Sequence, residues 1–276
     1  MPNVTVEENV MIPTTNGYAL AADISRPADS SGQAPGLLFI PGGGWVTANH
    51  EPLKERYGIP MAERGYVCIT ATYRIMEQAI WPAAIQDVKA MLRWMRANAD
   101  SLGIDPERIA LGGKSAGGHL SLLAAATNGS TEFDGDGPDA VPNAGYSSRI
   151  SAVIGVAPAS DIREYFRREP LQPYTANDSS DAAITAANPV ERVNSDYPPT
   201  LLVHGTDDDR VPHQMTMRMF AALEEAGVPT DLRLFAHQDH MFDGDPQFSP
   251  AIVEAMAHFL DRYVAAPVLE AVAADN

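Results

Sequence analysis

Short apolar runs alternate along this chain with stretches of helical periodicity, and this alternation restricts the possible fold more than any other feature. Two runs, residues 36–40 and 66–72, have the length and apolar content of buried strands, and four more runs are predicted as strands: residues 108–111, 152–157, 200–204 and 231–235. Four stretches have the pattern of a helix packed on a core: residues 84–95, 115–126, 214–225 and 252–263. Strands that alternate with helices favour the α/β class, with a mostly parallel, doubly wound sheet covered on both faces.

Three segments depart from this alternation. Residues 4–25 contain an Asn-Gly turn between two strand-like stretches and predict an N-terminal antiparallel hairpin. Residues 127–148 are rich in glycine, proline, asparagine and aspartate, which predicts a loop insertion. Residues 161–199 combine several prolines with weak periodicity, which predicts a small lid-like insertion beside the sheet. Because 276 residues fit one α/β domain with insertions, we expect residues 1–276 to form a single domain.

Charge and composition exclude several classes of partner. The chain has 36 acidic against 19 basic side chains, a net charge of −17, so we expect neither nucleic acid nor an anionic membrane as a partner. No apolar run approaches the roughly 20 residues that cross a bilayer. The first ten residues lack the apolar core of a signal peptide, so we expect a cytoplasmic protein. The single cysteine, Cys68, excludes an intramolecular disulfide and a cysteine-rich zinc site. The composition leaves a homodimer open.

The run Gly113-Lys114-Ser115-Ala116-Gly117 has the Gly-x-Ser-x-Gly pattern of a nucleophile elbow. Such a pattern arises by chance in roughly one chain in ten of this length, so its context decides. A predicted strand enters the run and an alanine- and leucine-rich helix leaves it, as the tight strand-to-helix turn of an elbow requires. A glycine-rich turn without chemical function is the alternative, but it would need no serine at its centre.

A second glycine run, residues 41–45, follows the predicted strand 36–40. Its three glycines let the backbone approach a substrate closely and direct N–H groups at it. Amides directed at a developing oxyanion stabilise the tetrahedral intermediate of acyl transfer. A flexible turn is the structural alternative, whereas a phosphate loop is not supported because no Gly-Lys-Ser/Thr follows this run.

An elbow hydrolase needs an acid and a histidine, in that order, after the serine. Both residue types occur just past predicted strands, where catalytic groups of α/β proteins meet. Three neighbouring aspartates compete for the role of the acid: Asp207, Asp208 and Asp209. Two histidines compete for the role of the base: His240 and, nearer to the strand end, His237.

With these motifs the chain resembles the α/β-hydrolase superfamily. Within it, the chain is most similar to compact esterases related to hormone-sensitive lipase and to bacterial acetyl and feruloyl esterases. The resemblance covers nearly the whole chain. It rests on the elbow, which continues into His119 and Leu120, and on the acid loop His-Gly-x-x-Asp-x-x-Val-Pro, which begins at His204. The glycine run departs from the family pattern, because Pro41 stands where the family has a histidine.

The resemblance implies roles for individual residues. It implies a catalytic triad of Ser115, Asp208 and His240. It implies an oxyanion hole formed by the amides of Gly43, Gly44 and Ala116, with the Trp45 amide as an alternate donor. We expect His119 to pack or bond to backbone. For Lys114 we expect a solvated cation, and contact with the substrate is the alternative that stays open. We also expect a substrate pocket that includes Trp45, Trp81 and Met241.

The expected activity is hydrolysis of a short- to medium-chain carboxylic ester through an acyl-enzyme, without a metal or cofactor. The expected partner is therefore a small-molecule ester. An arylformamidase-like amide hydrolase shares the same motifs and is the enzymatic alternative. A non-catalytic ligand-binding protein with this fold is a further alternative, which the complete set of Ser115, Asp208 and His240 disfavours.

Overall fold

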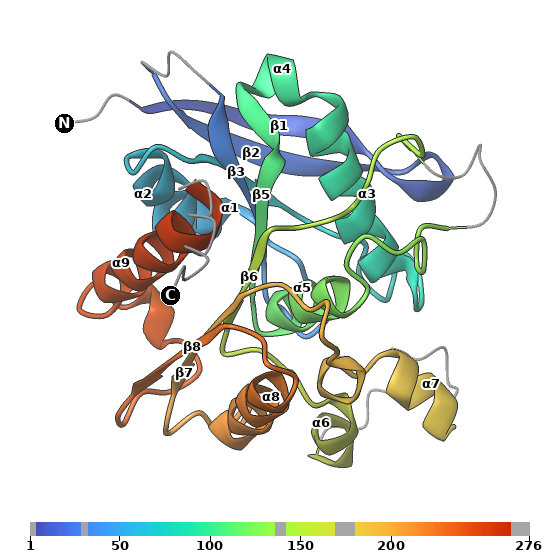
Figure 1. Ribbon diagram of the computed structural model, residues 1–276, viewed down its shortest axis with the longest axis vertical. Helices are drawn as coiled ribbons and strands as arrows, with labels where there is room; N and C mark the ends of the chain where they lie inside the picture. Colours follow the sequence, from blue (N-terminus) through green and yellow to red (C-terminus); the bar gives the residue numbers. More distant parts are fainter. Residues whose placement is uncertain (1–3, 29–32, 136–141, 169–179, 266–276) are drawn as a thin grey trace, which may run out of the picture.

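The computed structural model describes residues 4–28, 33–135, 142–168 and 180–265. An eight-stranded sheet in the order β1-β2-β4-β3-β5-β6-β7-β8 forms its centre (Figure 1). The strands are β1 (Val4–Pro13), β2 (Ala19–Pro27), β3 (Ala34–Ile40), β4 (Val67–Ala71), β5 (Ile104–Lys114), β6 (Ala152–Val156), β7 (Thr200–Gly205) and β8 (Thr230–Phe235). Neighbours from β4 to β8 pair in parallel. The predicted α/β class with a mostly parallel sheet is confirmed.

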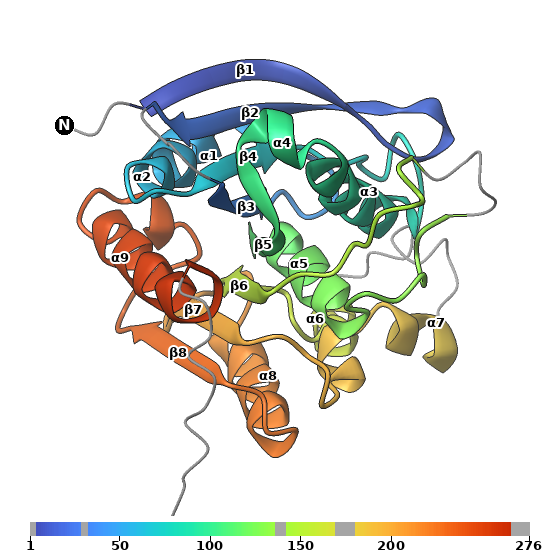
Figure 2. The ribbon, with the colours of Figure 1, turned by 45° about the horizontal axis from the view of Figure 1, so that its top comes forward.

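An antiparallel hairpin forms one edge of the sheet, as the sequence predicts. β1 pairs with β2, and β2 joins the sheet through antiparallel pairing with β4. The turn contains the 3₁₀ segment η1 (Thr15–Gly17), in which Asn16 (φ 59°) and Gly17 (φ 76°) adopt the left-handed conformation that Asn-Gly turns favour. Figure 2 shows this hairpin at one edge of the sheet and β8 at the other.

Helices cover both faces of the sheet. They are α1 (Glu51–Leu53), η2 (Lys54–Gly58), α2 (Ile59–Ala62), α3 (Ala83–Ala97), α4 (Ala99–Leu102), α5 (Ala116–Ala126), α6 (Ile162–Arg168), α7 (Asp181–Ala186), η5 (Pro189–Arg192), α8 (His213–Glu225), η6 (Phe242–Gly244), α9 (Ser249–Leu260) and η7 (Asp261–Ala265). Helices α3, α5 and α8 lie on one face, and α1, α2 and α9 lie on the other (Figures 1 and 2). The sheet is therefore doubly wound.

The pleat of β3 explains why its sequence is apolar throughout. Leu37 and Phe39 pack with α9 in one buried cluster, whereas Leu38 and Ile40 pack with α3 and α5 in the other. Side chains alternate between the faces of a strand, so a strand covered on both faces has no polar positions. Burial also raises the pKa of the free Cys68 thiol in neighbouring β4.

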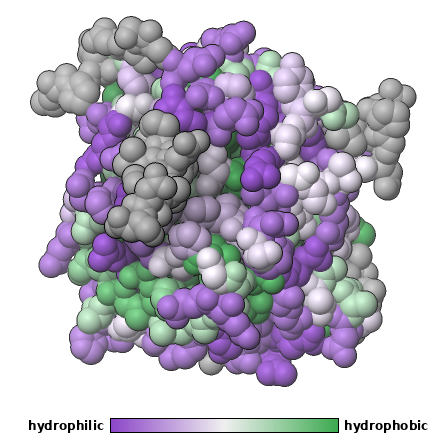
Figure 3. All heavy atoms as spheres, viewed as in Figure 1, coloured by the Kyte–Doolittle hydropathy of each residue, from purple (hydrophilic) through white to green (hydrophobic). Residues whose placement is uncertain are grey.

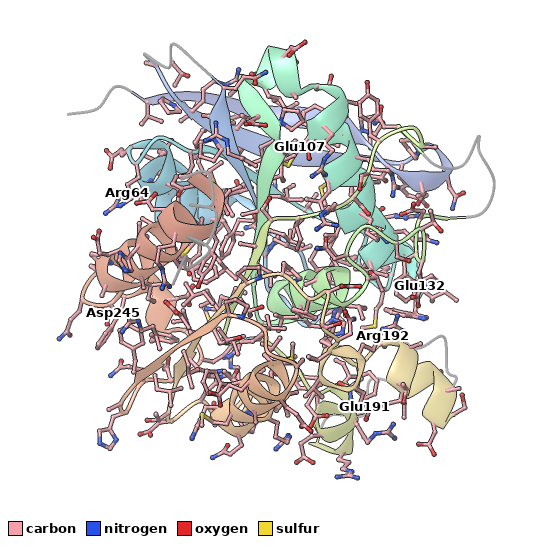
Figure 4. The ribbon with its side chains drawn as sticks, viewed as in Figure 1. Arg64, Glu107, Glu132, Glu191, Arg192 and Asp245 are labelled. Carbon is pink, nitrogen blue, oxygen red and sulfur yellow. The ribbon has the colours of Figure 1, made fainter. Side chains whose placement is uncertain are left out.

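Two insertions lie on the side of the sheet that carries α5. The described part of residues 127–148 consists of turns and irregular chain, and residues 136–141 lie outside the described residues. Within 161–199 the described residues form α6, α7 and η5, and residues 169–179 lie outside the description. Arg192 of η5 bonds to Glu132 of the first insertion at 2.6 Å (Figure 4). The two insertions are therefore joined to each other as well as to the sheet.

Most of the face shown in Figure 3 is hydrophilic. Among the helices of the described residues, none is long and apolar enough to cross a bilayer.

Candidate active site

Ser115 lies on a strained turn between β5 and α5. Its backbone has φ 53° and ψ −117°, a conformation that a residue with a Cβ rarely adopts. Its N–H donates to the Val156 carbonyl at 2.9 Å, which anchors the turn to β6. Small neighbours are required, because a Cβ on Gly113 or Gly117 would lie 2.3 Å from a backbone oxygen. The turn therefore has the geometry of a nucleophile elbow.

The structure brings Ser115, His240 and Asp208 into one hydrogen-bonded series. His240 follows β8, and its Nε2 lies 3.0 Å from Ser115 Oγ. Its Nδ1 lies 2.6 Å from Asp208 Oδ2, in the loop after β7. Because β5, β7 and β8 are parallel, the loops that follow them lie at the same end of the sheet, and all three residues meet there.

Asp208 is buried and its carboxylate is fully hydrogen-bonded. Oδ1 accepts the backbone N–H groups of Arg210 (3.0 Å) and Val211 (2.8 Å). Oδ2 lies 3.0 Å from His204 Nε2 as well as close to His240. Burial alone would raise the pKa of Asp208, but the hydrogen bonds from His204 and His240 outweigh it and hold the pKa well below its usual range. The carboxylate is therefore ionised at any pH near neutrality.

The competing residues lie elsewhere. Asp207 and His237 pair with each other on the surface, with Oδ2 and Nδ1 3.2 Å apart. Asp209 is exposed. Of the candidates that the sequence left open, the structure thus joins only Asp208 and His240 to the serine within the described residues.

Backbone amides of two segments surround Ser115. Gly43 and Gly44 line the cavity in front of the serine, and Ala116 begins α5 directly after it. The N–H groups of these three residues donate to no acceptor within the described part of the chain. Gly43 has φ +131°, and a Cβ there would lie 2.1 Å from the Thr47 carbonyl oxygen, so only glycine fits this turn. The amides are therefore open to an oxygen atom of a ligand.

A cavity of about 520 Å³ opens onto Ser115 and His240. Its lining combines the glycine run with polar, basic and apolar side chains: Pro41, Gly42, Gly43, Gly44, Thr47, Asn49, Pro52, Leu53, Arg56, Lys114, Ser115, Tyr165, Arg210, Val211, His240 and Met241. Met241 thus lies where the sequence analysis expected it. Within the described residues, no group of three or more His, Cys, Asp or Glu side chains could hold a metal ion.

Trp45 and Trp81 do not line this cavity, contrary to expectation. Trp45 is buried behind the glycine run and meets His119 and Tyr165 edge-on, with ring centroids 5.2 and 5.6 Å apart. Trp81 lines a separate small hollow and packs edge-on against Phe133. Both aromatic rings therefore contribute to packing. For Trp45, the tight glycine turn directs the indole into the core and away from the cavity.

His119 links the elbow helix to the second insertion. It is fully buried in α5, and its Nε2 lies 2.8 Å from the Ala187 carbonyl oxygen. The expectation that this histidine bonds to backbone is confirmed. Burial lowers the pKa of His119 to about 4, because the charged ring would lose its hydration.

The free energy of unfolding is expected to fall by about 2 to 3 kcal/mol between pH 7 and pH 4.5 through His119 alone. In this range the unfolded chain binds a proton at His119 and the folded protein does not, so acid favours unfolding. Urea denaturation at both pH values measures the difference. His119→Gln, which keeps a donor near Ala187 but does not titrate, should lose less stability on acidification than the wild type. His258→Gln, on the exposed side of α9, should behave as the wild type. Equal acid sensitivity of all three proteins would contradict the prediction.

Lys114, Arg56 and Tyr57 converge on the carboxylate of Asp243. Asp243 is fully buried, and its Oδ1 accepts from Lys114 Nζ. Its Oδ2 accepts from Arg56 Nη1 at 2.8 Å and from the Tyr57 hydroxyl at 2.9 Å. The expectation that Lys114 is a solvated cation is wrong, because its side chain is only 6% exposed. Lys114 directly precedes Ser115, and Asp243 lies three residues after His240. The cluster therefore connects the elbow to the loop that carries His240. Sequence analysis missed this cluster. The sequence shows an acid three residues after His240, but it does not show that this acid is buried or which cations it binds.

Asp243→Ala is expected to lower the free energy of unfolding by about 3 to 5 kcal/mol, because it leaves Lys114 buried without its counter-ion. Urea denaturation measures the loss. Asp231→Ala is the matched control, since Asp231 pairs with Arg262 at the surface and such pairs contribute at most about 1 kcal/mol. Similar losses in the two variants would show that the buried cluster does not stabilise the fold.

Comparison with known proteins identifies the family of this chain. A family model described as BD-FAE matches residues 22–223, a span that includes the glycine run, the elbow and Asp208. The chain belongs to the BD-FAE family. Probable carboxylic ester hydrolase LipM of Mycobacterium tuberculosis is 34% identical over 245 residues, which cover 82% of this chain and 54% of LipM. The chain spans about half the length of the curated relatives it matches.

Solved structures share the fold over nearly the whole chain. Esterase 2 of Thermogutta terrifontis, phosphonylated by sarin, is 26% identical with a TM-score of 0.80, over 97% of this chain and 98% of the esterase. A truncated carbohydrate esterase from gut microbiota is 25% identical with a TM-score of 0.78, over 93% and 96% of the two chains. The BD-FAE chain described here therefore has the α/β-hydrolase fold of these esterases.

Proposed function

We propose that this chain is a serine hydrolase that cleaves short- to medium-chain carboxylic esters through an acyl-enzyme. The observation that carries the proposal is the hydrogen-bonded series from Asp208 through His240 to Ser115 beside an open cavity. LipM is named a probable carboxylic ester hydrolase and the two similar structures are named esterases, which supports ester cleavage and does not favour the amide-hydrolase alternative. The net charge of −17 supports a small-molecule ester, not nucleic acid, as the partner.

Acylation begins with Ser115. The Oγ attacks the ester carbonyl carbon while His240 Nε2 takes the hydroxyl proton, which the 3.0 Å contact permits. The carbonyl π bond opens and its electron pair moves to oxygen. When the tetrahedral intermediate collapses, the bond to the alcohol oxygen breaks, and His240 returns the proton to the leaving alkoxide. Water then attacks the acyl-enzyme in the same way and releases the carboxylic acid.

Charge stabilisation is assigned to two sites around the serine. The open N–H groups of Gly43, Gly44 and Ala116 would hold the oxyanion, and losing one such donor costs about 3 kcal/mol in similar enzymes. The Trp45 amide, which the resemblance offers as an alternate donor, is left out of this assignment because it is hydrogen-bonded to the Tyr73 hydroxyl. On the other side, the ionised Asp208 holds His240 with Nδ1 protonated and stabilises the imidazolium that forms during each step.

The cavity supports short to medium acyl chains. Its lining includes apolar side chains, such as Leu53, Val211 and Met241, together with charged and polar ones. A long alkyl chain would therefore have to pass charged groups and desolvate them, which costs free energy.

Turnover of a p-nitrophenyl ester series tests the proposal. We expect acetate and butyrate to be hydrolysed and octanoate to be slower, with formanilide, an amide of comparable size, slower still. A fluorophosphonate probe should add its mass to the peptide that contains Ser115 and not to Ser115→Ala. Faster cleavage of formanilide than of any ester would favour the amide hydrolase. Absence of both turnover and labelling would favour the non-catalytic, ligand-binding alternative.

A further inference from the structure

The cavity in front of Ser115 is basic, although the protein as a whole is acidic. Arg56, Lys114 and Arg210 line it, and none of the described aspartates or glutamates does. The whole chain, with these three cations included, has a net charge of −17. Charges separated by more than about 8 Å are largely screened at physiological ionic strength. The lining cations therefore determine which charged groups bind beside the serine, while the distant acidic surface has little effect.

Two buried carboxylates neutralise part of this charge but not all of it. Asp243 lies beneath the lining and binds both Arg56 and Lys114, so two cations share one anion. Asp208 lies behind His240. With both carboxylates counted, the lining keeps an excess of one positive charge, and Arg210 is the cation for which the described residues provide no ion-pair partner.

Arg210 has its guanidinium free to bind a ligand. Its side chain is exposed and forms no ion pair or hydrogen bond with any residue in the described ranges. Its backbone N–H donates to Asp208 Oδ1 at 3.0 Å, so its main chain is fixed beside the catalytic acid. Arg56, at another part of the lining, uses one N–H group for Asp243 and is only 21% exposed. A guanidinium offers five donors, so both arginines have donors to spare.

We propose that this cavity selects esters that carry a carboxylate near the scissile bond, and that Arg210 binds this carboxylate, with Arg56 as the supporting cation. The inference rests on the proposed ester hydrolysis and names the substrate class for it. A carboxylate fits the planar fork of arginine through two parallel hydrogen bonds. Lys114 does not take this role, because its ammonium group is buried against Asp243.

Two pairs of esters that differ only in charge test the inference. In the first pair the charge lies on the acyl side: p-nitrophenyl hydrogen adipate and its neutral primary amide, p-nitrophenyl adipamate. In the second it lies on the alcohol side: 4-acetoxyphenylacetate and 4-acetoxyphenylacetamide. The ratio of kcat/KM for the anionic over the neutral member is measured for the wild type, Arg210→Gln and Arg233→Gln. Arg233 is exposed on β8 and does not line the cavity, so its variant controls for the change in net charge.

We expect a ratio of roughly ten for the wild type in at least one pair, as one charge-assisted, partly exposed contact provides. The pair that shows it identifies the side of the ester that bears the carboxylate. The ratio should fall to about one in Arg210→Gln, stay near ten in Arg233→Gln, and decrease for the wild type as salt rises from 20 to 500 mM. A wild-type ratio of one or less in both pairs, or a ratio that Arg210→Gln leaves unchanged, would overturn the inference. In that case turnover of the neutral esters would leave the proposed function intact. No turnover of any of the four esters would remove the proposed function, and this inference with it.

Discussion

Ser115→Ala is expected to lower kcat for p-nitrophenyl butyrate by a factor on the order of 10⁴ to 10⁶. Without the hydroxyl, no acyl-enzyme forms, and water must attack the bound ester directly. The amides of Gly43, Gly44 and Ala116 remain, so a small acceleration over the uncatalysed reaction should persist. Alanine adopts the positive φ of 53° about as poorly as serine, so the variant should fold with nearly unchanged stability.

Steady-state rates and the initial burst of p-nitrophenol measure this effect. The wild type should show a burst equal to the enzyme concentration if deacylation limits the rate, and the variant should show none. Ser101→Ala is the control, because Ser101 is exposed on α4 and its hydroxyl donates to the Asn98 carbonyl, at the opposite end of β5 from Ser115. Residual activity in Ser115→Ala above about one part in a hundred would exclude Ser115 as the nucleophile.

The sequence predicted the sheet well because most of its strands are buried on both faces. Such strands appear as unbroken apolar runs, and the predicted 36–40 and 200–204 match the observed β3 and β7 within two residues at each end. β5 is longer than the predicted 108–111, since it begins at Ile104. Asp105, Pro106 and Glu107 interrupt its apolar run, and its register with β3 shifts there, so periodicity could not extend the strand.

The helical segment formed by α1, η2 and α2 was missed. Sequence analysis assigned no element to residues 51–62, in which Pro52 and Pro60 lie. Each proline occupies the first turn of its helix, where the missing N–H would have no partner in any case. Local composition could not show this, because the position of a proline relative to a helix start depends on where the chain packs against the sheet.

The site could be predicted where function depends on local sequence. Ser115 and the glycine run lie in short motifs whose turns require those residues. The choice of Asp208 among three neighbouring aspartates came from the resemblance of its loop to the acid loop of the family. The partners of Lys114 could not be predicted, since Asp243 is 129 positions away and only the fold brings them together. The expectation for Trp45 failed for a related reason, because the direction of its side chain follows from the backbone of the glycine turn.

The second large effect is expected for Asp208→Asn, which should lower kcat by about 10⁴-fold while the fold of the site persists. The carboxylate accepts a hydrogen bond from His240 Nδ1, so Nε2 is left free to take the Ser115 proton. The amide nitrogen of asparagine can donate to Nδ1 instead, which places the ring proton on Nε2. In that tautomer His240 cannot act as the base. KM should change little, because Asp208 does not line the cavity.

Asp207→Asn and Asp209→Asn are matched controls for this prediction, since they make the same chemical change at the adjacent positions. Both side chains are exposed and neither contacts His240, so each variant should keep kcat within about twofold. A loss in Asp207→Asn as large as in Asp208→Asn would mean that the acid loop as a whole, and not one carboxylate, supports the base.

The pH dependence separates the role of Asp208 in catalysis from its role in folding. Its pKa in the folded protein lies below the value of about 4 that a free aspartate has, so its stabilising contribution is complete above pH 4 and is lost as the pH falls below it. Urea denaturation of the wild type and Asp208→Asn from pH 7 to pH 3 should therefore show a stability difference that is constant above about pH 4.5 and narrows below it. At pH 7 both proteins should be fully folded, so the difference in kcat at that pH comes from the site itself. If the loss of kcat in Asp208→Asn instead changed with pH in the same way as its loss of stability, the loss of activity would follow from partial unfolding and not from the wrong tautomer of His240.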